Sequence, residues 1–195
     1  MKNQSIHIKS KSTFRALVVA ITTPLLVLGL SGFITLNGNQ LIGGLQNRKY
    51  WLDGSVNSTL ESKIYSAKWL WGNATPKISL NKTLTKSQAQ ILIYESSTII
   101  EQSICGLAIP TDSNLVAVNF WAQNWSRGKI LLADEVRVNG APCVNGLGIV
   151  THEFGHLFGL FHSDQTQSIM REDVFRVNFF GPKQDDIDGI NEIYK

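Results

Sequence analysis

The sequence predicts an α/β domain in which three helices cover a mixed, twisted sheet. Segments with a helical spacing of apolar residues lie near the start and the end of residues 48–195, and short strand-like segments lie between them. No internal repeat or long linker interrupts this stretch, whose length is typical of one domain. Apolar residues make up 43% of the chain, which is enough to fill a core and excludes a disordered protein.

The chain begins with an apolar leader, which we assign to residues 1–36. Four basic residues precede a largely apolar run, the order typical of a secretory signal peptide, and we expect cleavage after Ser31. Extended to Leu36, the run has 21 residues, which is also enough for a membrane anchor. A buried helix is disfavoured because a proline interrupts the run. With either a signal peptide or an anchor, residues 37–47 would form a short linker, and residues 48–195 would be secreted or anchored outside the cell.

Helices are predicted over residues 59–71, 147–157 and 183–194. In the first helix, Ser58 is the expected N-cap, Glu61 completes a capping box, and Gly72 ends the helix. In the last helix, Asp185 and Asp186 lie at the N-terminal end, where the helix dipole stabilises negative charge. Strands are predicted over residues 77–80, 91–94, 115–121 and 136–139.

The net charge of +3 belongs to the leader. The whole chain has 18 basic and 15 acidic side chains, so without the four basic residues of the leader 14 basic and 15 acidic side chains are left. Nucleic-acid binding needs a basic patch on the domain itself, so we exclude nucleic acid as a partner and expect membrane contact only through the leader.

The clearest chemistry lies between His152 and His162. His152 and His156 are four residues apart on a predicted helix, so both can bind one zinc ion, with Glu153 beside them to act on a zinc-bound water. Gly159 can adopt the left-handed conformation that ends the helix, and the chain then returns His162 as a third ligand. Three ligands leave one position for water, as in a catalytic site. A chance pattern is disfavoured because three of the four histidines belong to it.

The motif H-E-x-x-H-x-x-G-x-x-H at residues 152–162 resembles that of the metzincin zinc proteases. Met170 matches the methionine turn of that family, which forms an apolar floor beneath the zinc ligands. Among metzincins, the chain is most similar to the matrixins, or matrix-metalloproteinase-like enzymes. Ser163 directly after the third histidine and residues 185–194, which match the closing helix, carry this resemblance. Residues 48–51 resemble the matrixin entry segment more weakly.

The resemblance implies a metzincin-type catalytic domain that cleaves protein or peptide substrates, with Glu153 as the general base. In the family the substrate lies along an edge strand, for which we expect residues 115–121. The alternative is a catalytically inactive, zinc-containing peptide-binding module of the same fold. In matrixins the Asp pair can also receive the ammonium group of a trimmed N-terminus. For Asp185 and Asp186 we favour the simpler interpretation, in which the helix dipole stabilises two acidic side chains at the helix N-terminus.

Further expectations concern the cysteines, the metals and the specificity. Cys105 and Cys143 are the only cysteines, and in an exported protein they would form one disulfide. We expect one zinc ion in a monomer, because no further histidines could hold a second. Calcium binding stays open, with residues 111–114 as a candidate loop. The residues after Met170 are Arg-Glu-Asp instead of the familiar Tyr-Pro, so cleavage specificity is not carried over.

Overall fold

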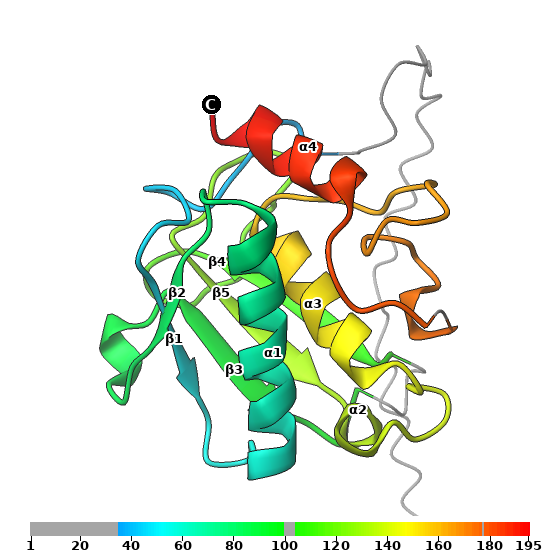
Figure 1. The fold of residues 1–195 in the computed structure, drawn as a ribbon. Coiled ribbons are helices and arrows are strands. Elements are labelled where there is room, and N and C mark those ends of the chain that lie inside the picture. Colours follow the sequence, from blue (N-terminus) through cyan, green and yellow to red (C-terminus); the bar gives the residue numbers. More distant parts are fainter. Residues whose placement is uncertain (1–34, 100–103, 177) are drawn as a thin grey trace, which may run out of the picture.

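The structure is a computed structural model that describes residues 35–99, 104–176 and 178–195 (Figure 1). Apart from its last two residues, the expected leader lies outside these ranges. None of the helices within them combines the length and the apolar character that a membrane span requires.

One sheet of five strands forms a layer of the domain (Figure 1). The strands are β1 (Arg48–Leu52), β2 (Leu80–Lys82), β3 (Ile91–Glu95), β4 (Gly106–Thr111) and β5 (Arg127–Leu132). Their order across the sheet is β2-β1-β3-β5-β4, and only the pair of β4 with β5 is antiparallel. This mixed sheet confirms the predicted α/β class, and it places β4 at one edge.

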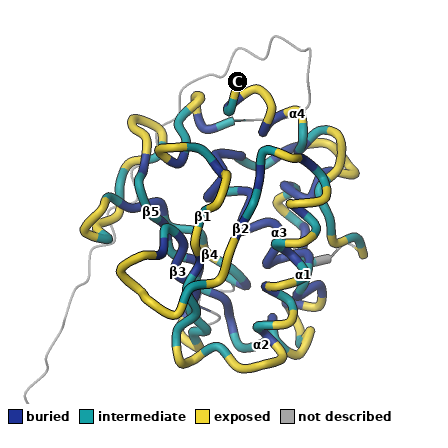
Figure 2. The backbone as a smooth tube through the Cα atoms, turned by 60° about the vertical axis from the view of Figure 1, so that its left-hand side comes forward, coloured by how far each residue is buried: buried dark blue, intermediate teal, exposed yellow. Residues whose placement is uncertain are grey.

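Two long helices lie side by side against the sheet, α1 (Ser58–Ala74) and α3 (Gly146–Leu157). Figure 2 shows that the buried backbone is concentrated between these layers. The indole N–H of Trp71 on α1 donates a 2.9 Å hydrogen bond to the carbonyl of Thr151, which ties the two helices together inside the core. The short helix α2 (Asp134–Val138) precedes α3, and α4 (Gln184–Ile193) closes the chain.

The predicted ends of the first helix are wrong by a few residues. Asn57, not Ser58, is the N-cap, because its side-chain oxygen accepts hydrogen bonds from the N–H groups of Thr59 and Leu60. The helix also continues through Gly72 to Ala74, because Gly72 has no positive φ and so does not adopt the left-handed conformation that ends a helix. The helices predicted over residues 147–157 and 183–194 are confirmed as α3 and α4.

Of the four predicted strands, residues 91–94 are confirmed and residues 77–80 overlap β2 by one residue. Residues 136–139 instead belong to α2 and its C-cap, because Asn139 turns the chain with a φ of 54°. Residues 115–121 form a loop, and Leu115 has a φ of 65°, which is incompatible with an extended strand. The strands β1, β4 and β5 were not predicted.

Residues 37–47, the expected linker, pack against the domain. Leu41 and Leu45 are 1% and 2% exposed. The Leu41 N–H donates to the hydroxyl of Tyr194 at 3.2 Å, and the Ile42 N–H donates to the Trp125 carbonyl at 2.7 Å. These bonds attach the segment before β1 to the end of α4 and to the loop before β5.

Candidate metal centre

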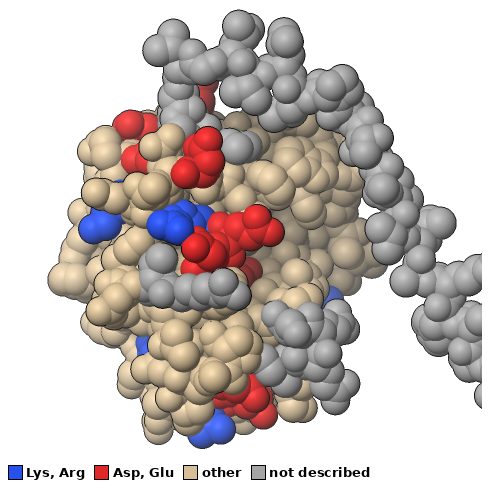
Figure 3. Space-filling model, turned by 90° about the vertical axis from the view of Figure 1, so that its right-hand side faces the viewer, with Lys and Arg blue, Asp and Glu red and all other residues tan. Residues whose placement is uncertain are grey.

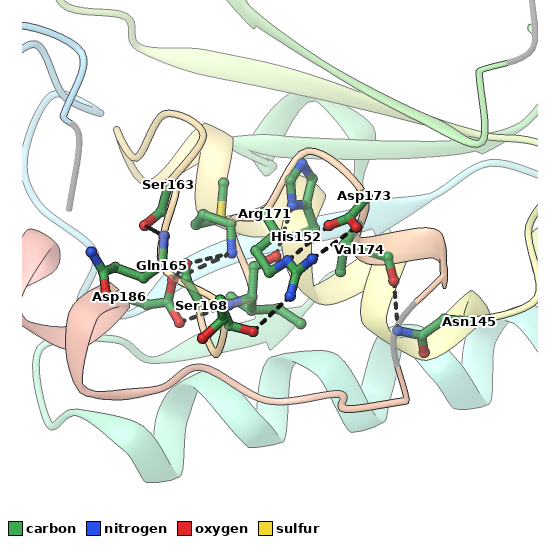
Figure 4. A network of polar contacts seen from close by, with 12 residues as sticks. Asn145, His152, Ser163, Gln165, Ser168, Arg171, Asp173, Val174 and Asp186 are labelled. Carbon is green, nitrogen blue, oxygen red and sulfur yellow. Dashed lines mark hydrogen bonds and ion pairs between the residues drawn. The ribbon is translucent and has the colours of Figure 1, made fainter. Parts of the chain in front are cut away.

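Helix α3 carries the first histidines of the motif, and Asn145 anchors its N-terminus. The side-chain oxygen of Asn145 accepts from the Gly148 N–H at 3.1 Å. Its amide group donates to the carbonyl of Val174 at 2.9 Å (Figure 4) and to that of Phe179 at 3.1 Å. One buried side chain therefore caps the helix and fixes the chain that follows the methionine turn against it.

Gly159 ends the helical part of the motif as the sequence predicted. Its φ is 96°, and a Cβ atom there would lie 2.9 Å from the carbonyl oxygen of Asn39. The Gly159 N–H donates to the His156 carbonyl at 3.0 Å, so the chain leaves the helix within one turn. It then reverses and brings His162 back toward α3.

The three motif histidines come together in one group. A ring nitrogen from each of His152, His156 and His162 lies within 4.8 Å of those of the other two. The Nδ1 atom of His152 is 2.9 Å from the Ile169 carbonyl, and that of His156 is 3.0 Å from the Leu160 carbonyl. Because a carbonyl only accepts hydrogen bonds, these Nδ1 atoms carry the protons. The Nε2 atoms are left with free lone pairs, which is the state that binds a metal.

Burial keeps these imidazoles neutral in the metal-free protein. It lowers the pKa of His152 well below its ordinary value and lowers that of His156 to about 4. The pKa of His162 is also lowered by burial, an effect that the nearby charge of Glu172 opposes. Neutral imidazole is the form that coordinates zinc, so the donor atoms and their protonation fit a three-histidine zinc site.

Glu153 follows the first histidine and points toward the edge strand. Its side chain is buried, and burial raises the pKa of its carboxyl to about 8 in spite of a hydrogen bond with the Ala108 backbone. A Cβ atom on Gly106 would lie only 2.6 Å from the carboxylate oxygen Oε1. The backbone of β4 therefore touches the carboxylate, an arrangement that the sequence did not indicate.

The methionine turn lies beneath the histidines. A Cβ atom on Gly155 would lie 2.3 Å from the sulfur of Met170, so this methionine packs directly against α3 between His152 and His156. The Ile169 carbonyl orients His152, as described above. The turn thus supports the metal centre through one apolar contact and one hydrogen bond, and Met170 itself is 1% exposed.

Asp186 of α4 holds the methionine turn in place. Its carboxylate accepts from the N–H groups of Lys183 at 2.8 Å and Ile169 at 3.0 Å, and from the hydroxyl of Ser168 (Figure 4). It is 1% exposed and so joins the start of α4 to the turn. Asp185 accepts from the Ser163 hydroxyl at 2.7 Å. The Asp pair therefore forms tertiary hydrogen bonds in addition to lying at the helix N-terminus, where we expected it to interact with the helix dipole.

The metal centre opens into a cleft of about 630 Å³ between β4 and α3. Leu107 and Ala108 of β4 line one wall, and the three histidines and Glu153 line the other.

The disulfide between Cys105 and Cys143 joins the start of β4 to the loop before α3, as expected, and Cys105 faces the cleft. In the candidate calcium loop, one oxygen of Asp112 accepts from the N–H groups of Asn114 and Val116. Calcium binding there stays a prediction.

A family model described as matrixin, a peptidase family, matches residues 50–195. The matched region contains all the helices and every residue of the metal centre.

Proposed function

Because the chain belongs to the matrixin family of peptidases, we propose that it is a zinc-dependent endopeptidase that cleaves proteins or peptides. The observation that carries this proposal is the arrangement of three neutral histidines and a buried glutamate in one cleft. The family match supports the peptidase class, and the geometry of the cleft supports an active enzyme.

The Nε2 atoms of His152 and His156 and one ring nitrogen of His162 would hold the zinc ion. Bound zinc supplies a Lewis acid and lowers the pKa of a water molecule toward neutrality. The carbonyls of Ile169 and Leu160 fix the tautomers and orientations of two of the three rings.

Glu153 would act as the general base and then as the general acid. Its carboxylate takes a proton as water attacks the scissile carbonyl, and it passes that proton to the departing amine. Gly106 and the rigid backbone of α3 hold the carboxylate at one position. In the metal-free protein burial raises the pKa of this carboxyl, and a raised pKa favours the second step, because the carboxyl holds the proton until the amine accepts it.

The outer edge of β4 would bind the substrate in an extended conformation. One side of β4 pairs with β5, while Leu107, Ala108 and Pro110 of β4 line the cleft. An added peptide strand would form main-chain hydrogen bonds with the part of this edge that precedes Pro110, because the Pro110 carbonyl already accepts from the Val118 N–H at 3.1 Å. This role replaces the one that the sequence suggested for residues 115–121.

The domain would work outside the cell as a monomer, either secreted or held by its N-terminal segment. Two observations support export: the order of charge and apolar residues in 1–36, and the buried disulfide between Cys105 and Cys143. Disulfides persist in oxidising compartments and are rare in the cytosol.

A cleavage assay on the purified, zinc-loaded protein tests the proposal. Unfolded casein and a mixture of synthetic peptides are incubated with the protein, and products are identified by mass spectrometry. Glu153→Ala should abolish cleavage without loss of zinc. Glu192→Gln, an exposed glutamate on α4 that pairs with Lys195, should keep wild-type activity. If the wild-type protein binds zinc and peptides but cleaves none, it is the inactive binding module and the proposal is wrong.

A further inference from the structure

The charges inside the cleft are all of one sign. Among the described residues that line it, Glu153 and Glu172 are the carboxylates, and none is a lysine or an arginine. The rest of the lining, apart from the histidines, is largely apolar. Glu153 is committed to the chemistry proposed above. Glu172 is a second carboxylate, and that chemistry does not use it.

The neighbours of Glu172 neutralise each other. The guanidinium of Arg171 forms two hydrogen bonds of 2.8 Å with the carboxylate of Asp173, and it also donates to the Thr166 carbonyl at 2.7 Å (Figure 4). These contacts fix the backbone on both sides of Glu172. Glu172 is exposed and forms no ion pair with any described residue. Figure 3 shows acidic side chains gathered near the centre of this side of the molecule.

Glu172 lies at the rim of the cleft, close to the metal centre. Its charge acts on His162, the third motif histidine. Val174 and Phe175, two and three residues further on, line the same cleft and offer apolar surface beside it. A long side chain of a bound peptide could lay its methylene groups along this surface and place its charged end at the carboxylate.

We propose that Glu172 determines specificity by binding a lysine or arginine side chain of the substrate close to the cleaved bond. The proposal rests on the peptidase function proposed above. Among the described residues that line the cleft, the only charged groups that a substrate cation meets are carboxylates, and Glu172 forms no ion pair with any described residue. An acidic side chain at the same position would meet like charge, so Glu172 also disfavours acidic substrates.

Matched peptides test this proposal. Each pair is identical except for Lys or Gln at one position, and the two residues on either side of the cleaved bond are varied in turn. For the wild-type protein, kcat/KM should favour Lys by about two- to fivefold at one of these positions, as for an exposed ion pair. The ratio should decrease with added salt, because salt screens charges at the rim.

Variants assign the preference to one carboxylate. Glu172→Gln should reduce the ratio to about one, and Glu172→Lys should reverse it in favour of a Glu-containing peptide. Asp164→Asn is the matched control, since Asp164 is exposed on the same loop but outside the cleft lining, and it should keep the wild-type ratio.

The outcomes separate the two proposals. Cleavage of the Gln peptides by the wild-type protein supports the peptidase function whatever the ratio. A ratio of one at every position, or a preference that survives in Glu172→Gln, overturns the role of Glu172 alone. If no peptide of either kind is cleaved, both proposals are wrong.

Discussion

Replacing Gly106 with alanine tests whether the β4 backbone holds the general base in position. A Cβ atom at residue 106 would lie 2.6 Å from the Oε1 atom of Glu153 and 2.7 Å from its Cγ atom. Gly106 has no positive φ, so alanine fits the backbone itself and the clash with Glu153 is the main effect. Because α3 is fixed on its other sides, we expect the carboxylate to move and the helix to stay.

The size of the effect follows from these distances. An ordinary contact begins at 3.4 Å, so the carboxylate must move by about 0.8 Å. A displacement of about 1 Å in a catalytic group costs about 100-fold in rate. We therefore expect kcat to fall by about 100-fold, within the range that a general base contributes. Overpacking should lower the free energy of unfolding by about 1–3 kcal/mol.

The assay compares kcat, zinc content and urea unfolding for the wild type, Gly106→Ala and Gly54→Ala. Gly54 is the matched control, because a Cβ atom there would meet nothing within 4 Å. Zinc content should be the same in all three proteins, since the three atoms nearest to an added Cβ at residue 106 all belong to Glu153, which is not a proposed ligand. If Gly106→Ala keeps the wild-type kcat, the β4 backbone does not position Glu153 and the proposed geometry is wrong.

Three further predictions concern stability and pH. Replacing both Cys105 and Cys143 by alanine should lower the free energy of unfolding in urea by about 3–4 kcal/mol, because the disulfide closes a loop with a sequence separation of 38. An unchanged free energy of unfolding would contradict this prediction. Asp186→Asn should lower the free energy of unfolding by about 2–4 kcal/mol in the same assay, since it weakens several buried hydrogen bonds. The exposed control Asp188→Asn should lower it by less than about 1 kcal/mol. Equal losses would show that Asp186 does not hold the turn. Burial raises the pKa of Glu153 from 4.5 to about 8, so the folded metal-free protein retains a proton that the unfolded chain releases, and stability falls as pH rises through this window. In the presence of a chelator, Glu153→Gln should therefore gain stability relative to the wild type between pH 5 and pH 8, and a difference that does not change with pH would refute the assignment.

The local parts of the fold could be predicted from the sequence. The motif histidines and Gly159 lie within eleven consecutive residues, and helical spacing alone places two of the rings on one face. The helices α3 and α4 were also predicted from local signals, namely Gly159 at the end of α3, and Pro182 and the acidic residues at the start of α4. The first residue of α1 could not be predicted. Asn57 and Ser58 are both good N-caps, and only the folded backbone selects between them.

The long-range parts could not be predicted. Strand β4 contains Gly106 and Pro110, two residues that weaken a strand pattern, and its edge position is what allows a proline there. The contact of Gly106 with Glu153 and the bonds of Asp186 with the methionine turn join residues far apart in the chain. These contacts form only when the sheet and the helices pack together, so no residue spacing in the sequence indicates them.

Titration of the metal-free protein with zinc, with peptide cleavage followed at each step, tests the central claim most directly. We predict that cleavage is absent without metal and rises in proportion to added zinc up to one equivalent per chain. Glu153→Gln should take up the same equivalent without cleaving, and His156→Ala should fail to retain it. Cleavage without metal, or zinc uptake that is unchanged in His156→Ala, would contradict the assignment of a three-histidine zinc centre.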